Sequence, residues 1–234
     1  MKKEEFKIIV EEKIGNNYLS ESGAVLYSSL KTTEYNSGPT GRLYFMGTNP
    51  GGNPQSMKDS TINKHLEELN DNFNEYINGI WNREKGQSPL QLHIKELFDV
   101  LHLDLENTFS TNLIFKRSST IRMLNDKEFK DWADMCWDFH LNFFIELDTK
   151  IIITNGIGIK STFMYIKNKQ MVTNLDYLNS GYSNWRIGKF DVTIQNKNMR
   201  VIGLPHLSYY SIKNKIEQQN WISVNIGNFL NKII

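Results

Sequence analysis

Residues 43–54 read LYFMGTNPGGNP, a short apolar run followed at once by glycine, asparagine and proline. An apolar run without alternation is typical of a strand that is covered on both faces of a sheet. The glycines and prolines after Met46 favour a tight turn, in which neither a strand nor a helix continues. We therefore predict a buried strand over 43–46 that ends in a polar loop.

Segments around this stretch alternate between strand and helix patterns. Apolar runs or alternating patterns predict further strands over 108–115, 150–154, 185–195 and 199–204. Apolar residues at three- and four-residue spacing predict helices over 2–14, 62–77, 89–101, 127–147, 156–169 and 216–230. Strands that alternate with helices indicate an α/β layer architecture with a mostly parallel sheet. The sequence contains no repeats or evident linkers, so a single domain over 1–234 is expected.

Composition excludes several classes of protein. The chain is 39% hydrophobic and 23% charged, as in globular proteins, and its net charge is +1, so any nucleic-acid surface has to be local. The single cysteine, Cys136, cannot form an intrachain disulfide or a cysteine-based metal site. Glu4 and Glu5 stand where a signal peptide would be apolar, and no apolar run could span a membrane. A cytoplasmic protein without membrane contact is expected.

Polar residues gather where three of the predicted strands end. Residues 48–51, 112–119 and 206–211 each lie at or directly after the end of one strand. Ligands of α/β proteins bind outside the carboxyl ends of parallel strands, which share one edge of the sheet. We therefore predict that these three clusters converge on one site.

The three clusters resemble motifs of the uracil-DNA glycosylase superfamily. Residues 47–51 (GTNPG) are similar to the G-x-N-P-G motif of its mismatch-specific and single-strand-selective branches. Residues 111–117 (TNLIFKR) resemble the segment whose asparagine pairs with a pyrimidine edge. Residues 206–211 (HLSYYS) match the H-P-S-P-L-S type of motif at the histidine and two serines. The order of the motifs agrees with the family, which raises their joint specificity.

The resemblance implies a three-layer sandwich with a four-stranded, mostly parallel sheet, and a DNA glycosylase that needs no cofactor or metal. It assigns catalysis to Asn49, which orients a water, and to His206, which hydrogen-bonds the departing base. The residues implied in base recognition are Thr48, Pro50, Gly51 and Asn112. The implied DNA contacts are Lys116, Arg117, Ser118, Ser119, Ser208, Tyr209, Tyr210, Ser211 and Lys213. DNA is the expected partner, and a monomer without an obligate protein partner is expected.

These residue types suit cleavage of an N-glycosidic bond. Positive charge develops on the sugar and negative charge on the base, and fixed hydrogen bonds stabilise both. An amide has no useful proton affinity, so Asn49 would orient a water without deprotonating it, and slower chemistry than with Asp is expected. Because the target base is stacked in the duplex, it must rotate out, and Tyr209 or Tyr210 would fill the gap.

Departures from the family pattern bear on the substrate. Leu207 and Tyr210 stand where proline and an apolar wedge are usual, and no aromatic residue follows Asn49 before Phe73. The segment before His206 is also longer than compact members need. These departures predict a roomier pocket, which favours an enlarged base such as hydroxymethylated or glucosylated cytosine of phage DNA, removed in antiviral defence.

Other hypotheses stay open on the sequence alone. The protein could repair uracil, act as a catalytically inactive sensor of DNA or nucleotides, or cleave free nucleosides. Each motif also has a structural interpretation: a tight turn over 47–52, a strand residue at Asn112 and a strand cap at His206. The tryptophan best placed to face a ligand is Trp185, in the long segment before His206, and the others are expected in the core.

Overall fold

The structure of the protein is a computed structural model that describes residues 1–34, 42–82 and 84–231. The described residues form one mixed six-stranded sheet in the order β2-β1-β3-β6-β5-β4. Neighbours among β2, β1, β3 and β6 are parallel, whereas β5 is antiparallel to β6 and β4 is antiparallel to β5. The strands are β1 (Leu43–Gly47), β2 (Phe109–Asn112), β3 (Ile151–Asn155), β4 (Asp176–Asn179), β5 (Arg186–Ile194) and β6 (Lys197–Leu204).

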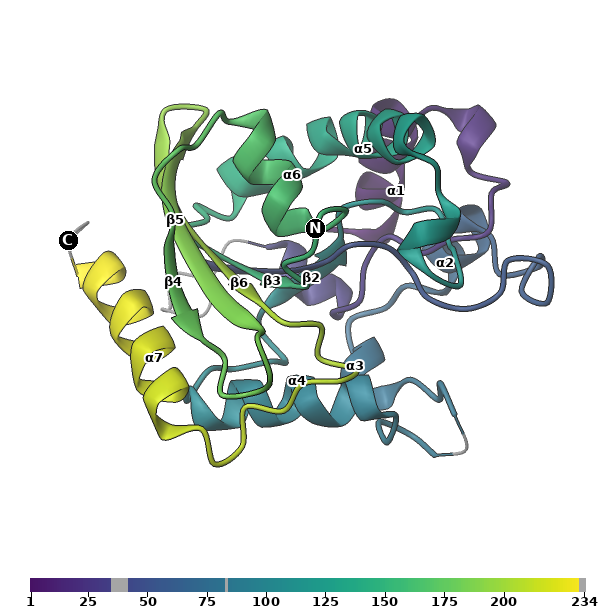
Figure 1. Ribbon diagram of the computed structural model, residues 1–234. Coiled ribbons are helices and arrows are strands. Elements are labelled where there is room, and N and C mark those ends of the chain that lie inside the picture. Colours follow the sequence, from purple (N-terminus) through teal and green to yellow (C-terminus); the bar gives the residue numbers. More distant parts are fainter. Residues whose placement is uncertain (35–41, 83, 232–234) are drawn as a thin grey trace.

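Helices cover both faces of this sheet. Figure 1 shows α1, α5 and α6 on one face and α3, α4 and α7 on the other, so that the sheet is the middle of three layers. The helices are α1 (Lys3–Ile14), α2 (Ile62–Glu68), α3 (Glu75–Asn78), α4 (Pro89–Val100), α5 (Asp126–Glu146), α6 (Thr162–Lys169) and α7 (Ile216–Asn231). Within the described residues, none of these helices is both long and apolar enough to cross a membrane.

The alternation of side chains along β1 divides the core into two parts. Tyr44 and Met46 pack with α1 and α5, whereas Leu43 and Phe45 pack with α4 and α7. Successive side chains of a strand point to opposite faces, so an unbroken apolar run is buried only where both faces are covered. The apolar run that predicts the first strand is therefore explained by two layers of helices.

The α/β class is confirmed, but the expected four-stranded sheet is wrong in size. Four parallel strands are present, and the hairpin of β4 and β5 extends the sheet beyond β6. The segment over Asp176–Asn179 is mostly exposed at the edge of the sheet, so its sequence lacks the apolar pattern of a strand. Edge strands need only one partner, and their burial signal is correspondingly weak.

Two predicted elements end earlier than the sequence suggests. The strand expected over 108–115 stops at Asn112; the Leu113 amide hydrogen-bonds to Gly47 at the end of β1, and the Ile114 amide to Thr48 in the loop that follows. The helix expected over 62–77 is divided into α2 and α3. Both differences are set by contacts with residues distant in the sequence, which local periodicity does not report.

Candidate functional site

The ends of the parallel strands bring the first two polar clusters together. The chain after β2 runs beside the loop after β1: the Ile114 amide donates to the Thr48 carbonyl (2.9 Å), and the Ser118 amide donates to the Pro50 carbonyl (3.1 Å). Because β1 and β2 are parallel neighbours, both segments leave the sheet at the same edge. The predicted convergence of these two clusters is confirmed.

Asn49 is held by its amide nitrogen. Nδ2 donates to the Ser118 hydroxyl (2.8 Å), the Pro50 carbonyl (2.8 Å) and the Ser118 carbonyl (3.3 Å). Carbonyl oxygens only accept hydrogen bonds, so these partners fix which end of the amide is the nitrogen. Among the described residues, Oδ1 accepts no hydrogen bond. Asn49 thus presents a rigidly oriented acceptor, which is the group needed to position a water.

Asn112 lies over Gly47, its partner in the register of β1 and β2. The Asn112 side chain is buried, and a Cβ at Gly47 would lie only 2.0 Å from its Oδ1. Only glycine leaves room for the amide, because any other residue would place a carbon inside its van der Waals contact. The glycine that ends β1 therefore positions Asn112 as well as the turn.

An aromatic side chain from outside the motifs, Tyr27, lies beside Asn112. Burial raises the pKa of Tyr27, while the charge of Arg117 and a hydrogen bond with the Asn112 side chain oppose this increase. The Tyr27 ring stacks on Tyr76 at 5.6 Å between centroids, and Trp81 meets it edge-on at 6.0 Å. The sequence predicted a pocket without such a ring. Tyr27 therefore supplies a ring beside Asn112 that does not come from the segment after Asn49.

Glu75 adds a carboxylate to this aromatic cluster. Its Oε2 accepts a hydrogen bond from the Trp81 indole (2.9 Å), and its backbone amide donates to the Tyr27 carbonyl (2.7 Å). Burial raises the pKa of Glu75, against the lowering by Trp81 and Arg117. Tyr27 and Glu75 were missed from the sequence because residues 16–41 carry no periodic pattern and α3 is only one turn long.

His206 follows β6 and lies on an anchored loop. The next residue donates its amide to the Asn155 Oδ1 (2.7 Å) and accepts from the His93 Nδ1 through its carbonyl (2.6 Å). The Ser208 amide donates to the His206 Nδ1 (3.2 Å), which requires an unprotonated nitrogen there. Although His206 is exposed as a residue, the protein packed around its ring lowers the pKa of His206. The neutral form thus carries its proton on Nε2, where it can be donated.

The third cluster lies at the same edge of the sheet as the first two, but farther along it. β3 separates β1 from β6, so the end of β6, two residues before His206, lies about 10 Å from the end of β1 at the usual spacing of strands. Gly156, directly after β3, donates its amide to the Leu204 carbonyl (2.9 Å), and a Cβ on it would lie 3.9 Å from the Thr48 hydroxyl. The loop after β3 therefore fills the interval between the two catalytic candidates.

Tyr210 does not have the predicted position. It is 1% exposed, and its hydroxyl donates to the Ser180 carbonyl (2.9 Å), whereas Tyr209 is 74% exposed. In the turn that follows His206, Leu207 and Tyr210 face the core, and the residues between them face solvent. Tyr210 is therefore an anchor of the loop, and of the two tyrosines only Tyr209 is available to stack on DNA.

The predicted serine contacts also divide into two groups. Ser118 is buried; its hydroxyl accepts from Asn49 and donates to the Thr120 carbonyl (3.1 Å), so that it fixes Asn49 and is not free for phosphate. The Ser211 hydroxyl donates to the Glu96 carboxylate. Ser119 and Ser208 remain at least partly exposed. A serine count in a motif cannot distinguish these roles, because they depend on partners far along the chain.

Of the predicted basic contacts, Lys213 is the most open. Lys116 forms ion pairs with Glu128 (3.1 Å) and Glu21 (3.5 Å), which compensate its charge. Arg117 donates from Nη1 to the carbonyl of Gly51, and thereby ties the chain after β2 to the first motif. Lys213 is exposed, with Glu96 at 3.9 Å.

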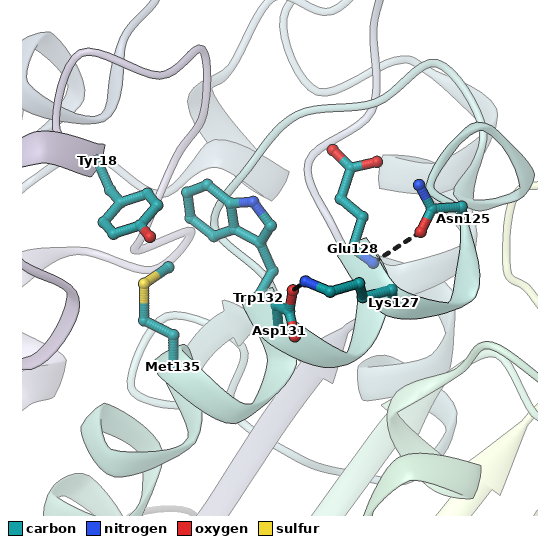
Figure 2. Close-up of a pocket in the computed structure, with 7 residues that line it drawn as sticks. All are labelled: Tyr18, Asn125, Lys127, Glu128, Asp131, Trp132 and Met135. Carbon is teal, nitrogen blue, oxygen red and sulfur yellow. Dashed lines mark hydrogen bonds and ion pairs between the residues drawn. The ribbon is translucent and has the colours of Figure 1, made fainter.

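A hollow of about 260 Å³ lies away from these residues, at the first turns of α5 (Figure 2). The Tyr18 and Trp132 rings meet edge to face there at 5.1 Å, and Lys127 pairs with Asp131 at 2.6 Å. None of its lining residues is one of the predicted site residues. In the described part of the chain, no group of three or more His, Cys, Asp or Glu side chains is placed to hold a metal ion.

Comparison of the sequence with models of protein families and with curated proteins gives no match.

Proposed function

We propose that the protein is a monofunctional DNA glycosylase, similar to the uracil-DNA glycosylase superfamily, that flips out a modified pyrimidine and hydrolyses its N-glycosidic bond. The observation that carries this proposal is the Asn49 amide: its nitrogen is fixed by Ser118 and Pro50, and its oxygen is left open. The edge of the sheet that holds this acceptor also holds Asn112 and a neutral His206.

The reaction needs a positioned water and a stabilised leaving base. The bond from C1′ to the base nitrogen breaks and its electron pair goes to the base, while the water oxygen bonds to C1′. His206 donates from Nε2 to the base oxygen where negative charge develops, and Asn49 orients the water. The water then loses a proton to solvent or to the base, which leaves an abasic sugar and a free base. Since Asn49 is no base, the water attacks late, once the sugar has become cationic.

Base recognition and DNA contact follow from the remaining residues. Asn112 offers a donor and an acceptor on one planar amide, which suits a pyrimidine edge. The centroids of the Tyr209 and His206 rings lie 6.0 Å apart, and Tyr209 is exposed, so its ring can fill the space left by the flipped base. Lys213 and the exposed part of Arg117 supply charge for phosphates.

Two substrates remain in competition. One is an enlarged cytosine of phage DNA, hydroxymethylated or glucosylated, whose removal would serve antiviral defence. The other is uracil, whose removal would serve DNA repair. Tyr27 offers a ring beside Asn112 to either base, so the experiment includes both substrates.

The test is an assay for abasic sites. Purified protein is incubated with oligonucleotides that contain uracil and with phage DNA that carries plain, hydroxymethylated or glucosylated cytosine, and strand breaks are read after alkali. We expect breaks on one substrate that disappear in Asn49→Ala and His206→Ala. Asn142→Ala is the matched control, because within the described residues its side-chain amide bonds only to Glu146 on α5.

Other outcomes contradict the proposal. DNA binding without breaks on any substrate would favour an inactive sensor of the same fold. A nucleosidase would cleave free nucleosides and would lack the salt-dependent affinity for DNA that phosphate contacts produce.

A further inference from the structure

The turn between β4 and β5 lies next to the candidate site. Gly188 pairs with Gly203 in the antiparallel register, so β5 begins at the end of the sheet where β6 leads to His206. Figure 1 shows this turn beside the connection from β6 to α7. The Tyr210 hydroxyl donates to a carbonyl of the turn (2.9 Å), which links the two segments directly. The hairpin that enlarges the sheet therefore extends the edge that carries His206.

The turn holds an exposed aromatic ring in a fixed position. Tyr182 is 51% exposed, and Trp185 meets it edge to face at 5.0 Å between ring centroids. The turn is closed by hydrogen bonds from the Ser180 amide to the Trp185 carbonyl (2.9 Å) and from the Trp185 amide to the Tyr182 carbonyl (3.1 Å). Trp185 also packs on the core, so it braces the outer ring. Tyr182 thus keeps a large apolar surface in water although the turn around it is rigid.

Positive charge lies directly after the turn, at the start of β5, beside a second exposed ring, that of Tyr177. Arg186 is exposed, lies 5.7 Å from the centroid of the Tyr177 ring, and forms no ion pair within the described residues. The carboxylate of Asp176, on the neighbouring strand, is paired with Lys189 at 3.1 Å. A cation beside exposed rings is the combination by which proteins bind unpaired nucleic acid: the rings stack on bases and the cation contacts phosphate.

We propose that the turn formed by residues 180–185, together with Arg186, stacks an unpaired base of the DNA strand next to the reacting nucleotide. In a continuous duplex each base is stacked between its neighbours, so only single-stranded or locally melted DNA offers a free face to Tyr182. The preferred substrate is therefore DNA that is unpaired around the target base. This inference rests on the proposed function. It adds the β4–β5 turn to the surface that would contact the DNA.

The test compares binding to single strands and to duplexes. Fluorescence anisotropy is measured at one salt concentration with labelled oligonucleotides of the same sequence, for wild type, Tyr182→Ala, Tyr182→Phe and Tyr18→Ala. Loss of one base–ring stack should weaken single-strand binding by roughly 5- to 100-fold in Tyr182→Ala, and duplex binding much less. Tyr182→Phe should keep wild-type affinity, because stacking does not need the hydroxyl. Tyr18→Ala controls for loss of an exposed tyrosine elsewhere, being 42% exposed beside α5.

The possible results separate this inference from the proposed function. Unchanged single-strand affinity in Tyr182→Ala, or equal weakening for single strands and duplexes, would overturn it. Single-strand binding that depends on Tyr182 without any abasic product would support base stacking by the turn and overturn the proposed glycosylase activity. If abasic product forms on both kinds of DNA and the Tyr182 variants form as much of it as wild type, the glycosylase activity would be supported and base stacking by the turn overturned. Because Tyr182 lies outside the core, thermal unfolding of the variants should match that of wild type.

Discussion

Replacing Gly47 with alanine tests the position of Asn112. A Cβ at Gly47 would lie 2.0 Å from the Asn112 Oδ1 and 3.2 Å from its Cγ, whereas the next nearest atom, the Thr111 carbonyl oxygen, is 3.9 Å away. The last distance is an ordinary van der Waals contact. The steric conflict is therefore confined to one side chain, and the backbone of Gly47 adds no strain because its φ is not positive.

The size of the effect follows from this geometry. Overpacking of a buried site costs about 1–3 kcal/mol, and alanine in a strand recovers roughly 0.5–1 kcal/mol relative to glycine. Gly47→Ala alone should therefore lower the free energy of unfolding by up to about 2.5 kcal/mol. In an Asn112→Ala background the conflict is gone, so the same change should be neutral or stabilising. The coupling energy between the two sites should be about 1–3 kcal/mol.

The assay is equilibrium unfolding in urea of the four proteins of the double-mutant cycle, with a common m-value as the check on two-state behaviour. If Gly47→Ala costs as much in the Asn112→Ala background as in wild type, the Asn112 amide does not lie over Gly47. In the abasic-site assay, Gly47→Ala should lose as much activity as Asn112→Ala, since both displace the same amide.

Three further predictions concern the site and the core. A carboxylate is the stronger base, and the sequence alone predicts faster chemistry with Asp at position 49; the structure reverses this prediction, because a carboxylate oxygen would replace the donor that faces two carbonyls. Asn49→Asp should therefore lower both stability, by about 1–3 kcal/mol, and abasic-site formation; faster turnover would contradict the role of the amide. Tyr210→Phe should cost about 0.5–1.5 kcal/mol in urea through loss of its bond to Ser180, and an unchanged midpoint would show that this bond contributes nothing. Burial lowers the pKa of His140 to about 4, so the unfolded chain takes up its proton first. The stability that this histidine contributes should be complete above pH 6.5 and fall by about 3 kcal/mol as the pH drops to 4, and this loss should shrink in His140→Gln.

The sequence predicted the class of fold and the end of the sheet, at the carboxyl ends of the parallel strands, where the candidate site lies. Alternating strand and helix patterns predict an α/β sheet, and the predicted α5 differs from the observed Asp126–Glu146 by one residue at each end. The first two polar clusters meet as predicted, because parallel strands deliver their carboxyl ends to one edge whatever their order. These features depend on local periodicity and on chain direction, which the sequence carries.

Roles within the clusters needed the tertiary structure. Tyr209 and Tyr210 are adjacent in one motif, yet one is exposed and the other is buried against Ser180. Likewise, Ser118 and Ser119 differ in that only the first reaches the Asn49 amide. A turn sends neighbouring side chains in different directions, so their exposure depends on what packs against each.

The sequence by itself therefore determined the layers of this protein and the positions of its polar loops, because spacing along the chain decides which side chains can be buried together. Only the tertiary structure decided that Tyr27 stands beside Asn112 and that the β4–β5 turn stands beside His206. Those contacts join residues far apart in the chain. Their free energy comes from packing and hydrogen bonds that form only when the whole sheet is assembled, and no local pattern encodes them.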